Sequence, residues 1–343
     1  MWLCLNFFTI MKTRVVSVSA LCFSLLVGCQ QSVDELTVNE EYPISIVASI
    51  GDAGGSRYSG DKPNDAAFAY GDNIGLAYKV GEDAATDFVK WTFDGRDWNQ
   101  NGSSLSWKNK DEEHTFYAFY PYVASAELTS VSMPLLTGQN GTMASVAERD
   151  FLVATKTQSY SDGGEVYFTG VENAFKHVSS LVVLKLKNAG DLIAATINSI
   201  SLTGANLVAA STYSFTATEM KVSLVDGDND DVMIANLSNG LMEEDDEYKE
   251  FYFVVNSGTV DLSAVTLSIT YKSVGGGVYT ATKQGLNQGN NDEKYERGHF
   301  YNYGITITTD KTLLISGYEI DEWVEGGSID DITINSEKQN QNS

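Results

Sequence analysis

Tyr42-Pro43-Ile44-Ser45-Ile46-Val47-Ala48 is the stretch that decides the fold class. Within it, Ile44, Ile46 and Ala48 fall on one side of an extended backbone, because successive side chains of a strand point to opposite faces. Such alternation over a few residues is typical of a strand with one face in a core and the other in solvent. We therefore expect a half-buried strand over residues 42–48.

Short apolar and aromatic runs of the same kind recur along the chain and are separated by Gly, Asn and Asp. No stretch of twelve or more residues has convincing helical periodicity. This spacing of short strands and turns predicts an all-β sandwich architecture. The runs lie at residues 74–80, 88–93, 105–107, 115–122, 151–154, 166–168, 181–186, 197–202, 213–215, 220–225, 251–255, 262–271, 301–308 and 313–320.

A polar stretch, Gln158-Ser159-Tyr160-Ser161-Asp162-Gly163-Gly164, divides these runs into two groups of similar length. Polar and glycine-rich segments are where domain boundaries usually fall. We expect an N-terminal β-sandwich over residues 42–160 and a C-terminal β-sandwich over residues 161–335. A polar tail follows at residues 336–343.

The first 41 residues have the pattern of a secretory leader followed by a tether. Met11-Lys12-Thr13-Arg14 precedes an apolar run from Val15 to Val27, and Gly28-Cys29 ends it. A transmembrane helix would need roughly 20 apolar residues, and this run is shorter. The ending resembles the lipobox of bacterial lipoproteins, which implies a signal peptide over residues 1–28 and a lipid on Cys29. Met11 is then the expected true start, and residues 29–41 the tether to an outer membrane.

Composition excludes several classes of function. All three cysteines, Cys4, Cys22 and Cys29, lie in or at the end of the leader, so the mature chain cannot form an internal disulfide. The net charge of -24 at pH 7 would repel phosphate backbones, which argues against binding to nucleic acid or to an anionic lipid surface. We interpret most of the acidic residues as a solvated surface.

No cluster of residues points to catalysis or to a cofactor. His114, His177 and His299 lie far apart and in no metal-ligand spacing. Nucleotide-binding and nucleophile-elbow motifs are absent from the sequence. A catalytic triad assembled from distant residues stays open at this stage, but nothing indicates one. We expect a protein that is not an enzyme and that needs no cofactor.

One acidic loop invites comparison with calcium-binding loops. Asp226, Asp228 and Asp230 alternate as oxygen ligands of Ca²⁺ do. The calcium-loop template then requires Gly where Asp231 stands and an acid where Leu237 stands. We therefore interpret this loop as an exposed hairpin turn and keep the three aspartates as a weak calcium candidate.

Three tryptophans, Trp91, Trp98 and Trp107, lie close together in the sequence. Aromatic rings can stack on sugars, so the cluster could form a carbohydrate platform. Their place in alternating strands favours packing in the core or at the edge of a sheet.

Five segments in consistent order resemble motifs of the fimbrillin-like proteins of Bacteroidales. Each is short, but together they extend over most of the mature chain, behind the lipobox. They are Gly71-Asp72-Asn73-Ile74-Gly75-Leu76, Phe116-Tyr117-Ala118-Phe119-Tyr120-Pro121, Asp150-Phe151-Leu152-Val153-Ala154, Phe175-Lys176-His177-Val178-Ser179-Ser180-Leu181 and Ile320-Asp321-Glu322-Trp323-Val324-Glu325-Gly326-Gly327.

This resemblance implies two tandem transthyretin-like β-sandwiches and a role in type V pili. In that family an arginine-specific protease removes the N-terminal strand of stalk and tip subunits, and a strand from a neighbouring subunit fills the groove. Arg57, in a glycine-rich loop after the first strand, is the expected cleavage site. An ordinary solvated arginine is the alternative, and anchor subunits of the family keep their lipid and are not cut.

The donor strand expected from the resemblance lies near the C-terminus, where Ile329, Ile332 and Ile334 could fill a groove. The alternative for this stretch is an edge strand of the second sandwich. The expected function is thus a structural or anchoring pilus subunit at the cell surface, with other pilus subunits as partners. The rivals are a lipid-anchored monomeric adhesin for a glycan or a host protein, and a secreted hydrolase.

Overall fold

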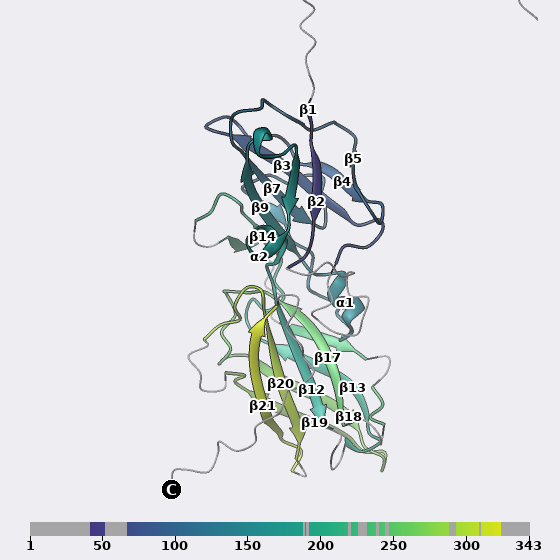
Figure 1. The fold of residues 1–343 in the computed structure, drawn as a ribbon. Helices are drawn as coiled ribbons and strands as arrows, with labels where there is room; N and C mark the ends of the chain where they lie inside the picture. Colours follow the sequence, from purple (N-terminus) through teal and green to yellow (C-terminus); the bar gives the residue numbers. More distant parts are fainter. Residues whose placement is uncertain are drawn as a thin grey trace, which may run out of the picture. The chain divides into compact units, whose positions relative to one another are not determined.

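The computed structural model describes residues 42–51, 67–187, 189, 192–218, 221–225, 232–237, 240–243, 247–287, 293–308 and 310–323. These residues form an almost entirely β-stranded structure (Figure 1). The predicted all-β class is confirmed, since the described part has only two short α-helices, α1 (Met143–Ala147) and α2 (Gly170–Asn173), and its helical turns include a 3-10 turn at Tyr160–Asp162.

The N-terminal half is built on a six-stranded antiparallel sheet with the order β11-β9-β7-β3-β4-β5. Its inner face carries alternate buried side chains such as Ile74, Leu76 and Phe116, as period-two patterning requires. The strands are β3 (Asn73–Val80), β4 (Val89–Phe93), β5 (Trp98–Asn101), β7 (His114–Tyr120), β9 (Leu152–Gln158) and β11 (Lys176–His177).

Two pairs of short strands contribute the rest of this first core. The antiparallel pair is β1 (Tyr42–Pro43) with β6 (Ser106–Trp107), and the parallel pair is β2 (Ser45–Ala48) with β10 (Glu165–Phe168). Their apolar side chains join those of the six-stranded sheet in one hydrophobic cluster. The strand predicted over residues 42–48 is therefore confirmed, as two consecutive short strands.

The C-terminal half consists of two four-stranded sheets that enclose a second core. One has the order β17-β12-β20-β21, with β12 and β20 parallel, and the other the order β16-β13-β18-β19. The strands are β12 (Ser180–Lys187), β13 (Thr196–Thr203), β16 (Val232–Asn236), β17 (Tyr248–Val255), β18 (Thr266–Lys272), β19 (Val278–Gln284), β20 (His299–Ile307) and β21 (Leu313–Glu322).

A small three-stranded sheet joins the two halves. It has the order β15-β14-β8, and β8 (Val131–Ser132) precedes α1, whereas β14 (Ser211–Tyr213) and β15 (Val222–Leu224) follow β13. Aromatic side chains of this sheet and its loops pack on the outer face of the six-stranded sheet, where Phe215 contacts Phe88 and Tyr117. The described halves are therefore connected by shared pairing and packing.

The boundary between the halves differs from the sequence-based expectation of residue 160. Gln158 is a buried end of β9, and its Nε2 donates to the carbonyl oxygens of Gly163 and Glu165. β10 follows at once and pairs with β2, and Phe175 is buried in the first core. Residues 158–164 thus form a tight turn, not a linker, and the transition lies between β11 and β12.

Candidate functional site

Every site residue predicted from the sequence lies outside the described residues. Arg57 falls in the undescribed stretch between Gly51 and Ala67, and the aspartates fall between Val225 and Val232. The full set comprises Cys29, Arg57, Asp226, Asp228, Asp230, Ile329, Ile332 and Ile334. The structure does describe the strand that precedes Arg57 in sequence, together with the groove that holds this strand.

The segment of residues 42–51, which contains β1 and β2 and is called the first strand from here on, fills a groove in the N-terminal core. Ile44, Ile46 and Ile50 are 4%, 5% and 1% exposed, and all belong to the first hydrophobic cluster. Val47, between them, is 37% exposed on the opposite face. The alternation read from the sequence therefore corresponds to a strand whose apolar side is inserted and whose other side faces outward. The half-buried strand expected over residues 42–48 therefore packs its isoleucine side against the first core.

Backbone hydrogen bonds hold the two ends of this strand. At its start, Ile44 N–H donates to the Leu105 carbonyl at 3.3 Å. At its end, Ser49 N–H donates to Phe168 O at 3.0 Å and Gly51 N–H donates to Phe175 O at 3.1 Å. Phe175 N–H in turn donates to Ser49 O at 3.0 Å, so Phe175 is bound on both its polar groups by the strand.

The parallel pair β2–β10 fixes the register of the inserted strand. Ser45 is opposite Glu165 and Val47 is opposite Tyr167, along the length of both strands. In the figure, β2 lies in front of the six-stranded sheet (Figure 1). A shift by one residue would turn the isoleucines outward, which is why the groove selects one register.

The contacts that hold the first strand in its groove are non-covalent, and their combined contribution to the free energy of folding is large. Full burial of an isoleucine side chain contributes about 1.5–3 kcal/mol. Three such side chains, with the backbone bonds, make the strand a firmly held part of the first core. Its removal would leave an open apolar groove and unpaired backbone groups on β10 and Phe175, which another strand of the same pattern could satisfy.

A second constellation joins residues from three distant segments. His177 Nδ1 lies 3.0 Å from Asp150 Oδ1, and both side chains are buried. The indole ring of Trp323 stacks on the His177 imidazole with ring centroids 3.9 Å apart and planes inclined by 3°. Sequence reasoning noted these three residues only as members of separate motifs. A polar residue inside an apolar run was the available signal.

This constellation has no catalytic geometry. Among the described residues, no serine or threonine hydroxyl is hydrogen-bonded to His177. The indole of Trp323 covers one face of the His177 ring. His114 is buried, which lowers its pKa, and its Nε2 accepts from Lys108 N–H. Its Nδ1 lies 2.9 Å from Glu112 O. The third histidine, His299, has its Nδ1 3.0 Å from Arg297 O.

The tryptophan cluster is part of the core. Trp91, Trp98 and Trp107 are all buried in the first hydrophobic cluster, and Trp107 Nε1–H donates to Gly164 O at 3.1 Å. The interpretation as core packing is confirmed, and the carbohydrate platform is wrong for these residues because their faces are covered.

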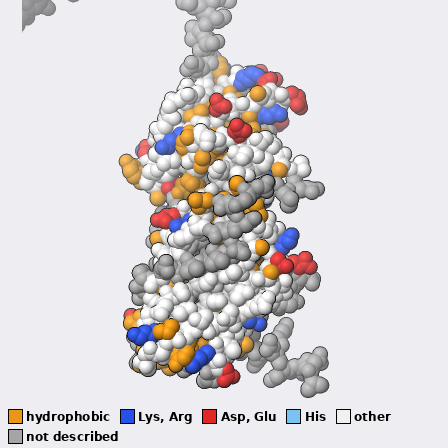
Figure 2. Space-filling view, turned by 180° about the vertical axis from the view of Figure 1, so that it is seen from behind, with side chains coloured by type: hydrophobic (Ala, Val, Ile, Leu, Met, Phe, Trp, Pro, Cys, Tyr) orange, Lys and Arg blue, Asp and Glu red, His pale blue; other side chains and the backbone are white. Residues whose placement is uncertain are grey.

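The described residues contain neither a group of His, Cys, Asp and Glu side chains suited to a metal ion nor a helix able to cross a membrane. Figure 2 shows acidic and basic side chains intermixed on the face that it presents, instead of one continuous acidic patch. This distribution agrees with the interpretation of charged residues as a solvated surface.

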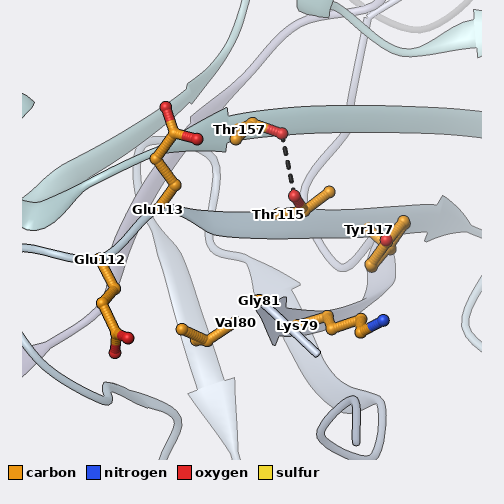
Figure 3. Close-up of a pocket in the computed structure, with 8 residues that line it drawn as sticks. All are labelled: Lys79, Val80, Gly81, Glu112, Glu113, Thr115, Tyr117 and Thr157. Carbon is orange, nitrogen blue, oxygen red and sulfur yellow. Dashed lines mark hydrogen bonds between the residues drawn. The ribbon is translucent and has the colours of Figure 1, made fainter. Parts of the chain in front are cut away.

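A hollow of about 510 Å³ lies where β3 ends, β7 begins and β9 ends. Lys79, Glu113 and Tyr117 border it, and the hydroxyls of Thr115 and Thr157 meet at 3.0 Å on its floor (Figure 3). These groups can donate and accept hydrogen bonds, but the hollow holds no nucleophile paired with a base. It is a polar recess on the outer face of the six-stranded sheet.

Comparison with solved structures places this architecture among proteins of Bacteroides. A candidate cell adhesion protein from Bacteroides uniformis matches with TM-score 0.56 and 16% identity, over 84% of this chain and 99% of that one. A second from Bacteroides ovatus matches with TM-score 0.52 and 18% identity, over 84% and 99% of the two chains. These likenesses concern the fold.

A fimbrial protein from Bacteroides vulgatus is also similar, with TM-score 0.49 and 15% identity over 82% of this chain and 99% of that one. No curated protein sequence matches the chain. The fimbrillin-like family model matches residues 61–323, well over half of the sequence. The chain therefore belongs to the fimbrillin-like family, a non-enzymatic family.

Proposed function

We propose that this chain is a structural or anchoring subunit of a cell-surface pilus that assembles by strand exchange. In this proposal the precursor comprises two tandem transthyretin-like sandwiches and is tethered to the outer membrane by a lipid on Cys29. Cleavage at Arg57 releases the first strand. A segment carrying Ile329, Ile332 and Ile334 from a neighbouring subunit then enters the groove.

The docked first strand is the observation that carries the proposal. It enters the core through three buried isoleucines, and the chain that follows it after Gly51 leads to Arg57. A cut there would leave the strand held by non-covalent contacts alone. A donor strand of similar alternation can place apolar side chains in the same sites, as Ile332 and Ile334 would from one face of an extended backbone, and can form backbone hydrogen bonds with the same partners.

Digestion with an arginine-specific protease tests the proposal. The mature chain lacking the lipid should lose a fragment ending at Arg57 and then form oligomers, measured by light scattering during size-exclusion chromatography. Arg57→Lys should stay intact and monomeric under the same digestion. A trimmed protein that has lost its first strand and remains monomeric at high concentration would contradict strand exchange.

The polar hollow supports a second candidate function, a monomeric adhesin for a glycan. Lys79, Glu113 and the two threonine hydroxyls offer both donors and acceptors to sugar hydroxyls. A printed array of neutral and uronic-acid oligosaccharides measures this directly. Binding lost in Glu113→Gln and Thr157→Val, but kept in the distant surface variant Val278→Ala, would favour the adhesin. An array without signal would count against it.

A further inference from the structure

The groove of the first strand and the end of β21 meet at one short segment. Phe175 N–H and C=O are both bonded to the first strand, through Ser49 O and Gly51 N–H. The Phe175 ring is buried in the first core, where it packs edge-to-face against Phe68 at 5.1 Å. The position of Phe175 therefore depends directly on the occupied groove.

Two residues later, His177 belongs to a different set of contacts. Its ring is held between the Asp150 carboxylate, at 3.0 Å, and the stacked indole of Trp323, at 3.9 Å between centroids. Trp323 follows directly after β21 and is buried. The seat of Trp323 thus depends on the position of His177.

Backbone bonds reinforce this second set. Trp323 N–H donates to Gly298 O, and Gly298 N–H donates to Ser179 O at 3.0 Å. Gly298 has φ +69°, and a Cβ at that position would lie 3.2 Å from the His177 carbonyl oxygen, so the approach of these backbones is close. The end of β21, Gly298 and residues 177–179 consequently form one tightly connected cluster.

Only Lys176 lies between Phe175 and His177, and Lys176 and His177 together form the two-residue strand β11. β11 pairs with β9 through Lys176 opposite Val153 and His177 opposite Leu152. So short a strand has little independent pairing to hold it when one flank loses its contacts. Emptying the groove would free both polar groups of Phe175, and the disturbance would reach His177 within two residues.

We infer that occupancy of the first-strand groove is energetically coupled to the seating of Trp323 through residues 175–177. The inference rests on the proposed function for its biological meaning, because the candidate donor Ile329, Ile332 and Ile334 follows Trp323 in sequence. In a subunit whose groove is filled, Trp323 is seated and the start of the C-terminal segment is fixed. In a subunit whose groove is empty, that seat is weakened.

Hydrogen–deuterium exchange on the intact, monomeric mature chain tests the coupling in both directions. The variant Ile46→Ala/Ile50→Ala loosens the strand, and Val47→Ala is its matched control because Val47 is on the same strand and faces outward. We expect the double variant to speed exchange at Gly298 and Trp323 at least five-fold, and Val47→Ala to leave it unchanged. Rates are taken relative to amides of the β13–β18 pair.

Coupling between sites is reciprocal, so the converse experiment must agree. Trp323→Ala should speed exchange at Ser49 and Gly51 at least five-fold, whereas Leu314→Ala, at an exposed position of β21, should not. The inference is overturned if either variant changes only its own site, or if all amides, those of β13–β18 included, speed up equally. Because no assembly is involved, these outcomes are independent of whether the chain polymerises.

Discussion

Single residues explain why the family motifs have their form. Gly75, in the first motif, lies under the ring of Phe119, and a Cβ at residue 75 would come 2.4 Å from Phe119 Cε1. Phe119 is itself fully buried among aromatic residues of the third hydrophobic cluster, so it has little room to move. The glycine is therefore required by packing across neighbouring strands, and its φ is not positive.

We expect Gly75→Ala to destabilise the protein by about 1–3 kcal/mol, since overpacking a filled site has that cost. Urea unfolding followed by tryptophan fluorescence measures the change. Gly275→Ala is the control, because its nearest neighbour is Ser273 Oγ at 3.9 Å and the site is open. Equal stability of the two variants would show that the Phe119 contact is unimportant.

Two tyrosines in the C-terminal core make stability depend on alkaline pH. Burial raises the pKa of Tyr295 and of Tyr303 above the ordinary value of 10.0. Above pH 10 the unfolded chain loses these protons and the folded chain keeps them, so the unfolded state binds fewer protons and stability falls as pH rises.

The expected slope is about 1.4 kcal/mol per pH unit for each tyrosine, between pH 10 and the raised pKa values. Together the two tyrosines set the slope of the free energy of unfolding against pH, and Tyr303→Phe should remove about half of it. Tyr70→Phe, at a largely exposed position, should not change the slope. Urea unfolding at pH 9, 10 and 11 provides the comparison. An identical slope in wild type and Tyr303→Phe would contradict the assignment.

Among the elements, the strand pair β2–β10 was only half predictable. The alternation of Ile44 and Ile46 predicts an inserted strand, and the structure contains this strand. Its partner Glu165-Val166-Tyr167-Phe168 was recognised as a strand but placed in the other half, because no local pattern indicates parallel pairing with a segment about 120 residues away. Long-range pairing is decided by the closure of the core, not by neighbours in sequence.

Other elements were missed for local reasons. β5, with Trp98 followed by Asn99, Gln100 and Asn101, has almost no β-branched or apolar residues, so only its pairing with β4 makes it a strand. Gln158-to-Gly164 looked like a linker because of its polarity, yet Gln158 and the Ser159–Asp162 cap satisfy its backbone groups. Beyond their separate motifs, the only sign in the sequence that Asp150, His177 and Trp323 meet was a polar residue inside an apolar run.

The two faces of the inserted strand should contribute unequally to the free energy of unfolding. We expect Ile46→Ala to cost about 2–5 kcal/mol, the usual range for truncating a buried isoleucine, because the groove cannot collapse around the lost atoms. Val47→Ala, on the outward face, should cost well under half of that amount. Chemical denaturation of both variants decides the matter, and similar losses for the two would refute the orientation of the strand.

The two halves should unfold together, because the small sheet β15-β14-β8 takes strands from both. Phe215, which follows β14, packs on residues of the N-terminal half: its ring centroid lies 5.4 Å from that of Tyr117 and 6.0 Å from that of Phe88. We expect one calorimetric transition for the wild-type chain and two for Phe215→Ala. Val278→Ala, at an exposed site, should keep one transition. Two transitions in the wild-type protein would show that the junction is weak.

For the molecule as an assembling unit, a disulfide between β2 and β10 is the most direct test that the first strand must leave. Ser45→Cys and Glu165→Cys place thiols at opposed positions of the parallel pair, in a chain with Cys29 replaced. After cleavage at Arg57, the account predicts monomers under oxidising conditions and polymers after reduction, measured by light scattering. Polymers of equal size with the disulfide intact, or none after reduction, would contradict strand exchange.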